Sequence, residues 1–263
     1  LFQLQPSFTL FHVMQATKKL ASSAFSRSVS KSLSTVHKGN AFEERGRKIL
    51  EEHLSMSLTR VGGKSDGGVD LQGWWWLPPL VGRTGPPLPF AAAMPDNQSA
   101  ERTRLRVFAQ CKAEKKKFSP NYVREMEGVL YRYLAQSTMP KTGPAYPLVA
   151  ILISESAFTS ATLLRAQSSP VPFVLLHLPP TDGATEGGND IHSLSCLGGA
   201  FWNPALSSHR GVLRGQIELR WERAAEAVGR PGLWWQGKRL QSWTPDRASE
   251  MEEGFEVPKI NVN

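Results

Sequence analysis

Cysteine and long apolar runs are scarce in this sequence, and the first 42 residues contain no acidic side chain. The two cysteines, Cys111 and Cys196, exclude a disulfide framework. The six histidines show no ligand spacing, so the chain lacks the pattern of a structural zinc site. The longest apolar run, residues 148–153, has strand length, whereas a bilayer-spanning helix needs roughly 18 to 20 residues. We therefore predict no membrane span.

The missing acids leave residues 1–42 with charge of one sign. This segment holds five Lys and Arg residues, is rich in serine, and has Phe, Leu and Val spread among the basic residues. Such a composition is typical of a mitochondrial transit peptide, and a merely disordered N-terminus is the alternative. We predict that residues 1–36 form a transit peptide or disordered leader, and that the protein lies in the mitochondrion, in the matrix.

The positive charge of the chain belongs mostly to this leader. The formal net charge is +8, and the five basic residues of the leader leave only +3 for residues 43–263. A basic surface is the usual electrostatic signature of nucleic-acid binding. The net charge is therefore no argument that the body of this protein binds nucleic acid.

Hydrophobic periodicity predicts an α/β arrangement. An amphipathic helix is expected over residues 40–58, with Asn40 as its N-cap and two glutamates in its first turn. The pattern further predicts strands at 58–61, 69–76, 105–112, 148–154 and 173–178, and helices at 119–136 and 160–167. Strands that alternate with helices indicate a sheet flanked by helices. Of the three tryptophans at 74–76, we expect at most one face to be buried.

Two regions interrupt or extend this core, which we place at residues 37–178. Residues 77–104 contain six prolines and are expected to form a poorly structured insertion between two strands. Such an insertion costs only a slowly growing closure entropy. Residues 179–263 are expected to form a loop and a C-terminal extension, with a strand at 215–221 and an aromatic segment at 233–235. The sequence assigns this extension no role.

Two short segments, residues 62–73 and 107–112, carry side chains suited to phosphodiester hydrolysis. Mg²⁺ prefers oxygen ligands, which the Asp70 carboxylate, the Gln110 side-chain amide and the Cys111 backbone carbonyl can supply. Residues i and i+2 of a strand point to the same face. Gln110 and Lys112 should therefore face the site, while the Cys111 thiol points into the core. Lys112 would polarise the attacking water or steady the phosphate charge.

Each of these residues also has a simpler interpretation. Asp70 could cap a turn after two glycines, and Lys112 could be a solvated lysine at a strand end. Glu43, on the first helix, could bind a second metal or orient water, or could only complement the helix dipole. The lysine-rich run at 112–117 could be a solvated loop or could grip phosphates.

The order Glu43, Asp70 and Gln110-Cys111-Lys112, with the turn at 65–70, resembles the PD-(D/E)XK restriction-endonuclease-like superfamily, in particular its Mrr-type branch. Residues 39–43, the Trp-rich stretch at 73–78 and residues 110–112 are similar to the fungal mitochondrial family named "required for respiratory growth protein 7". This resemblance covers about residues 37–178.

The resemblance implies an α/β/α sandwich with a mixed central sheet and a C-terminal extension. It also implies Mg²⁺ as the cofactor, DNA as the nucleic-acid partner, and Asp70, Gln110, Lys112 and Glu43 as the site residues. We expect a mitochondrial protein required for respiratory growth, with a metal-dependent nuclease-like core. The alternatives are a catalytically inactive factor of mitochondrial genome maintenance or expression on the same fold, and a scaffold that binds partners through the tail.

Overall fold

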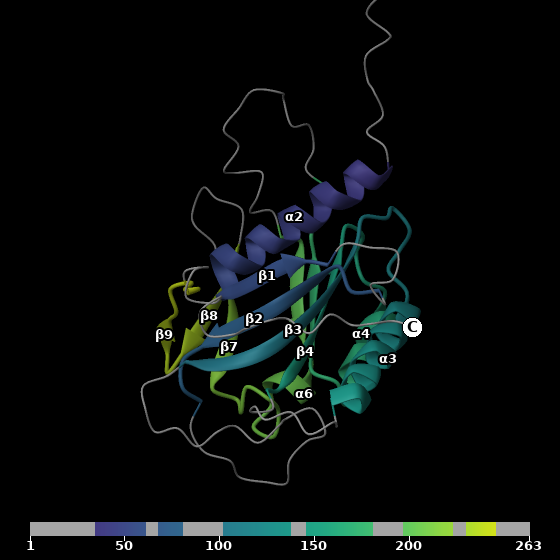
Figure 1. The fold of residues 1–263 in the computed structure, drawn as a ribbon. Helices are drawn as coiled ribbons and strands as arrows, with labels where there is room; N and C mark the ends of the chain where they lie inside the picture. Colours follow the sequence, from purple (N-terminus) through teal and green to yellow (C-terminus); the bar gives the residue numbers. More distant parts are fainter. Residues whose placement is uncertain are drawn as a thin grey trace, which may run out of the picture. The chain divides into compact units, whose positions relative to one another are not determined.

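The structure, a computed structural model, describes residues 35–61, 68–80, 102–137, 146–180, 197–222 and 230–245. The chain divides into two compact units, Leu1–Lys38 and Gly39–Asn263. Of the first unit only residues 35–38 are described, as the first residues of a helix. The second unit contains the remaining described elements (Figure 1).

A six-stranded mixed sheet forms the centre of this unit, with its strands in the order β1-β2-β3-β4-β5-β6. The three middle strands, β3, β4 and β5, run parallel, and the outer pairs β1–β2, β2–β3 and β5–β6 are antiparallel. The strands are β1 Met56–Arg60, β2 Leu71–Leu77, β3 Thr103–Lys112, β4 Leu148–Ser154, β5 Phe173–His177 and β6 Gly199–Trp202.

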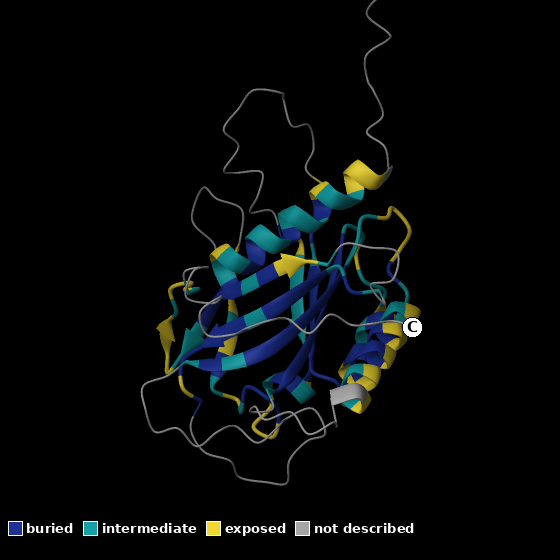
Figure 2. Ribbon diagram, in the orientation of Figure 1, coloured by how far each residue is buried: buried dark blue, intermediate teal, exposed yellow. Residues whose placement is uncertain are grey.

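Helices cover both faces of the sheet (Figure 1). Helix α2 (Thr35–Leu54) packs on one face, and α3 (Pro120–Ser137) and α4 (Ser160–Gln167) pack on the other. Strand β4 is buried along its whole length because its alternate residues enter two different cores. Val149, Ile151 and Ile153 join the α2 core, while the residues between them join the α3 core (Figure 2). No described helix is long and apolar enough to cross a membrane.

The C-terminal segment packs on the α2 face of the sheet. It contains α6 (Pro204–Ser207) and a small antiparallel sheet of β7 (Ile217–Glu222), β8 (Arg230–Trp235) and β9 (Lys238–Arg239). Apolar side chains from this segment complete the α2 core, namely Leu206, Val212, Leu213, Ile217 and Leu233. The extension is thus part of the folded core around α2.

The predicted order of elements between the first helix and β5 is confirmed, and β4 and α4 begin and end at the predicted residues. The first helix differs, because it begins at Thr35 and ends at Leu54. Asn40 lies inside this helix and is not its N-cap; its Oδ1 accepts a hydrogen bond of 2.8 Å from Arg60. The helix stops early because Ser55 adopts a left-handed backbone with φ of 57°, and Leu58 already belongs to β1.

Strands β2 and β3 pair across the proline-rich insertion, in a register that runs from Leu71 opposite Ala109 to Leu77 opposite Thr103. The Leu80 amide donates to Thr103 Oγ1 at 3.1 Å, and the Leu80 carbonyl accepts from Arg214 at 2.8 Å. The insertion was predicted to span 77–104, but both of its end residues lie in paired strands. Its remainder, residues 81–101, lies outside the described residues.

The tryptophans of β2 correct another expectation. Trp75 and Trp76 are both buried although they point to opposite faces, so the prediction that at most one face is buried was wrong. Trp75 joins the α2 core. Trp76 packs edge-to-face on Trp243, with ring centroids 5.9 Å apart, and its indole N–H donates to Ser57 Oγ at 2.8 Å. Trp243, which follows β9, thus covers Trp76 on the face opposite the α2 core, a contact that sequence periodicity does not reveal.

Candidate metal and phosphate site

Asp70 lies directly before β2 and beside the last residues of β3. Its backbone amide donates to the Ala109 carbonyl at 2.9 Å, and its Oδ2 accepts from the Cys111 amide at 2.6 Å. The carboxylate thus takes the place of a strand partner where the β2–β3 pairing has ended. The structure therefore brings Asp70 together with the Gln110-Cys111-Lys112 segment, from which it is separated by the insertion in sequence.

Gln110 is a buried amide with an unused acceptor. The residue is only 5 % exposed, and its Oε1 has no hydrogen-bond partner. A buried polar atom without a partner costs about 1–3 kcal/mol, so native structures rarely keep one without a reason. Gly68 leaves room for this side chain, because a Cβ at Gly68 would lie 3.1 Å from Gln110 Nε2. The φ of Gly68, +84°, also favours glycine.

Cys111 turns its thiol away from this position, as predicted. Its Sγ lies 3.9 Å from the place where a Cβ on Gly46 of α2 would be, and it packs against the α2 core. Burial raises the pKa of the thiol well above its usual value, and the negative charges of Asp70 and Glu43 add to that rise. The thiol stays protonated at neutral pH and is a poor nucleophile. Because the N–H and C=O of one strand residue point to the same neighbour, the Cys111 carbonyl faces the Asp70 side.

Lys112 points to the α3 face. Its Nζ lies 5.1 Å from the ring centroid of Tyr122, and the Tyr122 hydroxyl donates to Glu114 at 3.2 Å. The Lys112 carbonyl accepts from the Glu155 amide at 3.0 Å, which fixes the end of β3. Within the described part of the chain, no carboxylate forms an ion pair with Lys112. The ammonium group therefore lies over the face of an aromatic ring, in a cation–π contact.

Glu43 reaches the same region from α2. Its carboxylate accepts from Arg60 on β1, with the two nitrogens of Arg60 at 2.8 and 2.7 Å from Oε2. Glu43 and Asp70 both act on the Cys111 thiol, so the two carboxylates lie near the same strand end. The role of Glu43 as a metal ligand stays a prediction, since the structure gives its carboxylate a basic partner.

The donor set fits a hard cation. The Asp70 carboxylate, Gln110 Oε1 and the Cys111 carbonyl are all oxygens, the ligands that Mg²⁺ prefers. The described residues contain no group of three or more His, Cys, Asp or Glu side chains that could hold a metal. A bound Mg²⁺ would therefore rely on one carboxylate, one amide and one carbonyl, with water completing its shell. Residues 62–67, including Asp66, lie outside the described residues.

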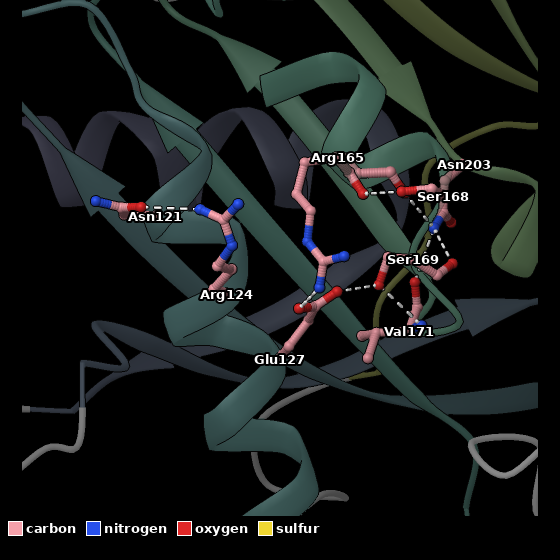
Figure 3. Close-up of polar contacts among 9 residues, drawn as sticks. Asn121, Arg124, Glu127, Arg165, Ser168, Ser169, Val171 and Asn203 are labelled. Carbon is pink, nitrogen blue, oxygen red and sulfur yellow. Dashed lines mark hydrogen bonds and ion pairs between the residues drawn. The ribbon is translucent and has the colours of Figure 1, made fainter. Parts of the chain in front are cut away.

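A second polar cluster, which the sequence did not reveal, lies between α3, α4 and the amino end of β5 (Figure 3). Glu127 of α3 forms an ion pair with Arg165 of α4 and accepts from Ser169 Oγ at 2.6 Å. Asn203 is fully buried, and its amide bonds five backbone groups: the carbonyls of Ala166, Ser169 and Val171, and the amides of Phe173 and Leu206. The saturated amide of Asn203 ties α4, β5 and α6 together.

The fold defines a mixed α/β protein, and the candidate site lies at the carboxyl end of the parallel strand β3, a position where ligands bind in open α/β sheets. Residues 34–196 match the family described as "Required for respiratory growth protein 7", and the chain belongs to this family. The matched range contains every site residue considered above. The predicted family is thus confirmed.

Several fungal proteins are similar to this chain. The Saccharomyces cerevisiae (strain S288c) protein named "Required for respiratory growth protein 7, mitochondrial" is 30% identical over 184 residues, 60% of this chain and 71% of that protein. The protein of that name from Candida glabrata is 26% identical over 208 residues, 72% and 79% of the two chains. An uncharacterized mitochondrial protein of Schizosaccharomyces pombe is 31% identical over 144 residues, 55% and 45% of the two chains. No solved structure matches.

Proposed function

We propose that this chain is a mitochondrial-matrix protein required for respiratory growth, with a restriction-endonuclease-like core that hydrolyses phosphodiester bonds, those of DNA in the first instance. The observation that carries the proposal is the unpartnered, buried Gln110 Oε1, on the strand end where the Cys111 amide binds the Asp70 carboxylate and where Lys112 follows. Both the names of the fungal relatives and the acid-free leader support the mitochondrial location.

In this proposal, metal binding and stabilisation of the phosphate charge are assigned to different residues. Asp70, Gln110 Oε1 and the Cys111 carbonyl would hold Mg²⁺, which supplies Lewis-acid stabilisation of the phosphate and a more acidic bound water. Lys112 steadies the charge that develops on the phosphoryl oxygens or holds the attacking water. The Cys111 amide donates to Asp70 Oδ2 and so fixes the carboxylate at the end of β3.

Glu43 takes a supporting part in this proposal. Its bonds to Arg60 join α2 to β1 and keep a negative charge near the end of β3. From that position Glu43 could orient water or hold a second cation once Arg60 moves aside. An Arg60→Ala variant should then bind Mg²⁺ at least as tightly as the parent protein.

The direct test is cleavage by the purified full chain of supercoiled plasmid, linear duplex, single-stranded DNA and RNA with Mg²⁺. We expect cleavage that EDTA stops and that Lys112→Ala and Asp70→Asn reduce by about 100-fold or more. Lys115→Ala is the matched control, because Lys115 is an exposed lysine three residues away. Activity no higher than that of Lys112→Ala on every substrate would eliminate the active-enzyme proposal.

The second candidate is a catalytically inactive factor that binds nucleic acid on the same fold. It is favoured by the pairing of Glu43 with Arg60, because one of the proposed metal ligands is then already occupied by a basic side chain. Calorimetric titration with Mn²⁺ and Mg²⁺ separates the two candidates. If Asp70→Ala leaves both affinities unchanged, the catalytic site does not exist and the second candidate remains.

A further inference from the structure

A row of arginines and aromatic rings runs along the amino half of β3, away from the candidate metal site. In the β2–β3 register Arg106 lies opposite Trp74, and Arg104 lies opposite Trp76. Cross-strand partners of this kind point to the same face of a sheet. Arg102 precedes the strand in the same alternation. We call these residues, together with Tyr146 and Trp243, the Arg–aromatic row.

Cations and rings alternate along this row. The Arg102 guanidinium lies 4.1 Å from the ring centroid of Trp243, and Arg106 lies 5.0 Å from that of Trp74. Between them, the Arg104 guanidinium lies 5.8 Å from Trp76 and 5.3 Å from Tyr146. The row begins where α3 ends, because Tyr133, in the last turns of that helix, packs on Phe108 at 4.7 Å.

Among the residues that the structure describes, no carboxylate pairs with Arg102 or Arg106. Within the described residues, neither Arg102 nor Arg106 forms an ion pair, and no nitrogen of the Arg106 guanidinium meets a partner in hydrogen-bond geometry. Burial lowers the pKa of Arg106, which is 2 % exposed, and the Tyr133 hydroxyl opposes that shift without adding negative charge. Burial also lowers the pKa of Arg102. Arg102, which is partly exposed, is therefore a positive charge that an external anion could contact, whereas Arg106 is too buried for such a contact.

We infer that the Arg–aromatic row docks a single strand of nucleic acid. Surfaces that bind single strands combine cations that contact phosphates with aromatic rings on which bases stack. An acidic peptide would use the cations but would gain little from the rings. Trp243 is 41 % exposed, and Arg102, Arg104 and Tyr146 are partly exposed, so the row is open to a ligand.

This surface is separate from the proposed metal site. Arg104 and Lys112 are eight residues apart on one strand, which corresponds to roughly 26 Å at about 3.3 Å per residue. Phe108 lies between them, fully buried under α3. Strand docking at the row therefore does not depend on hydrolysis, and each activity can be lost without the other.

The test is fluorescence anisotropy of labelled oligothymidylate with the full chain in EDTA, so that no hydrolysis occurs. Trp243→Ala should raise the Kd by about tenfold, because one stacking ring is lost. Trp221→Ala is the matched control, since Trp221 is an exposed tryptophan on β7, in the separate three-stranded sheet. Arg102→Gln should raise the Kd about fivefold and reduce the salt slope by about one phosphate contact. Trp243→Phe should bind nearly as the parent does.

Several results would overturn the inference. They are absence of binding by the parent chain, equal weakening by Trp221→Ala, and displacement by polyglutamate as effective as by oligothymidylate at equal charge. The last of these would assign the row to an acidic peptide. Trp243→Ala could also weaken binding by destabilising the fold, which a lower unfolding midpoint would show. In that case Arg102→Gln and Trp243→Phe test the inference, and unchanged binding by Arg102→Gln overturns it. Loss of binding in Lys112→Ala would place the strand at the metal site instead.

Discussion

Two buried amide side chains, Asn203 and Gln110, occupy opposite ends of the parallel strands and have opposite hydrogen-bond states. Asn203 is fully buried and bonds five backbone groups through its Nδ2 and Oδ1. Gln110 is almost as buried, yet its Oε1 bonds nothing. A saturated amide holds a fold together, whereas an unsaturated one keeps an acceptor ready for a ligand at some loss of stability. The same chemical group thus distinguishes the structural end of the sheet from the functional end.

Removing the saturated amide should have the largest effect. Asn203→Ala removes one side-chain hydrogen bond from each of three carbonyls and two amides, and we expect it to lower the free energy of unfolding by about 3 kcal/mol or more. Denaturant unfolding measures this loss. Asn121→Ala, which removes only an exposed contact with Arg124, should change stability by less than about 0.5 kcal/mol. Similar losses in the two variants would contradict the structural role of Asn203.

A second variant tests the space reserved for Gln110. Gly68→Ala places a side chain on a left-handed residue and within 3.1 Å of Gln110 Nε2, so unfolding should become easier by about 1–2 kcal/mol. Gly128→Ala is the matched control on the exposed side of α3, where nothing lies within 4 Å. That control should stabilise the protein by up to about 1 kcal/mol. Thermal unfolding of both variants checks the opposite signs.

One substitution of Gln110 should leave the metal-free protein at least as stable as the parent. Gln110→Met replaces the unpartnered amide with an apolar side chain of similar length, and the metal-free protein should be unchanged or up to about 1 kcal/mol more stable. The same variant should lose Mn²⁺ binding in calorimetry. A clear destabilisation without metal would show that Gln110 has an internal partner and is not held for a cation.

The smallest expected effect concerns the Cys111 thiol. In a Cys196→Ser background, iodoacetamide at pH 8 should modify Cys111 several-fold more slowly than a cysteine of the urea-unfolded chain, because burial, Asp70 and Glu43 raise its pKa. Adding Asp70→Asn removes one negative charge and should lower that pKa and speed the reaction. An unchanged rate would mean that the charge of Asp70 does not affect the pKa of the Cys111 thiol.

Elements with strong local signals could be predicted from the sequence. The unbroken apolar run of β4 is buried on both faces, and α4 begins after Thr159, whose Oγ1 accepts from the Thr162 amide. Strand β6 gave no such signal, because it is a four-residue edge strand that depends on pairing with β5. The start of the first helix was wrong because Asn40 is bound by Arg60, a partner on another element.

The part of the site that depends on a local sequence pattern could also be predicted. Alternation along a strand placed Gln110 and Lys112 on one face and the Cys111 thiol on the other. The hydrogen bond of Asp70 to the Cys111 amide, the pairing of Glu43 with Arg60 and the network of Asn203 all join residues distant in sequence. No periodicity records such contacts, so these features needed the tertiary structure.

The pairing that joins β2 and β3 at the base of the insertion has a further consequence for engineering. Leu77 pairs with Thr103, and Leu80 is bonded on one side to Thr103 and on the other to Arg214. The register of β2 and β3 is therefore fixed by these contacts, independently of the length of chain between Leu80 and Thr103. This makes the protein a natural host for a guest sequence: a reporter domain or an affinity tag spliced between residues 81 and 101 should leave the sheet, the metal site and the Arg–aromatic row in place.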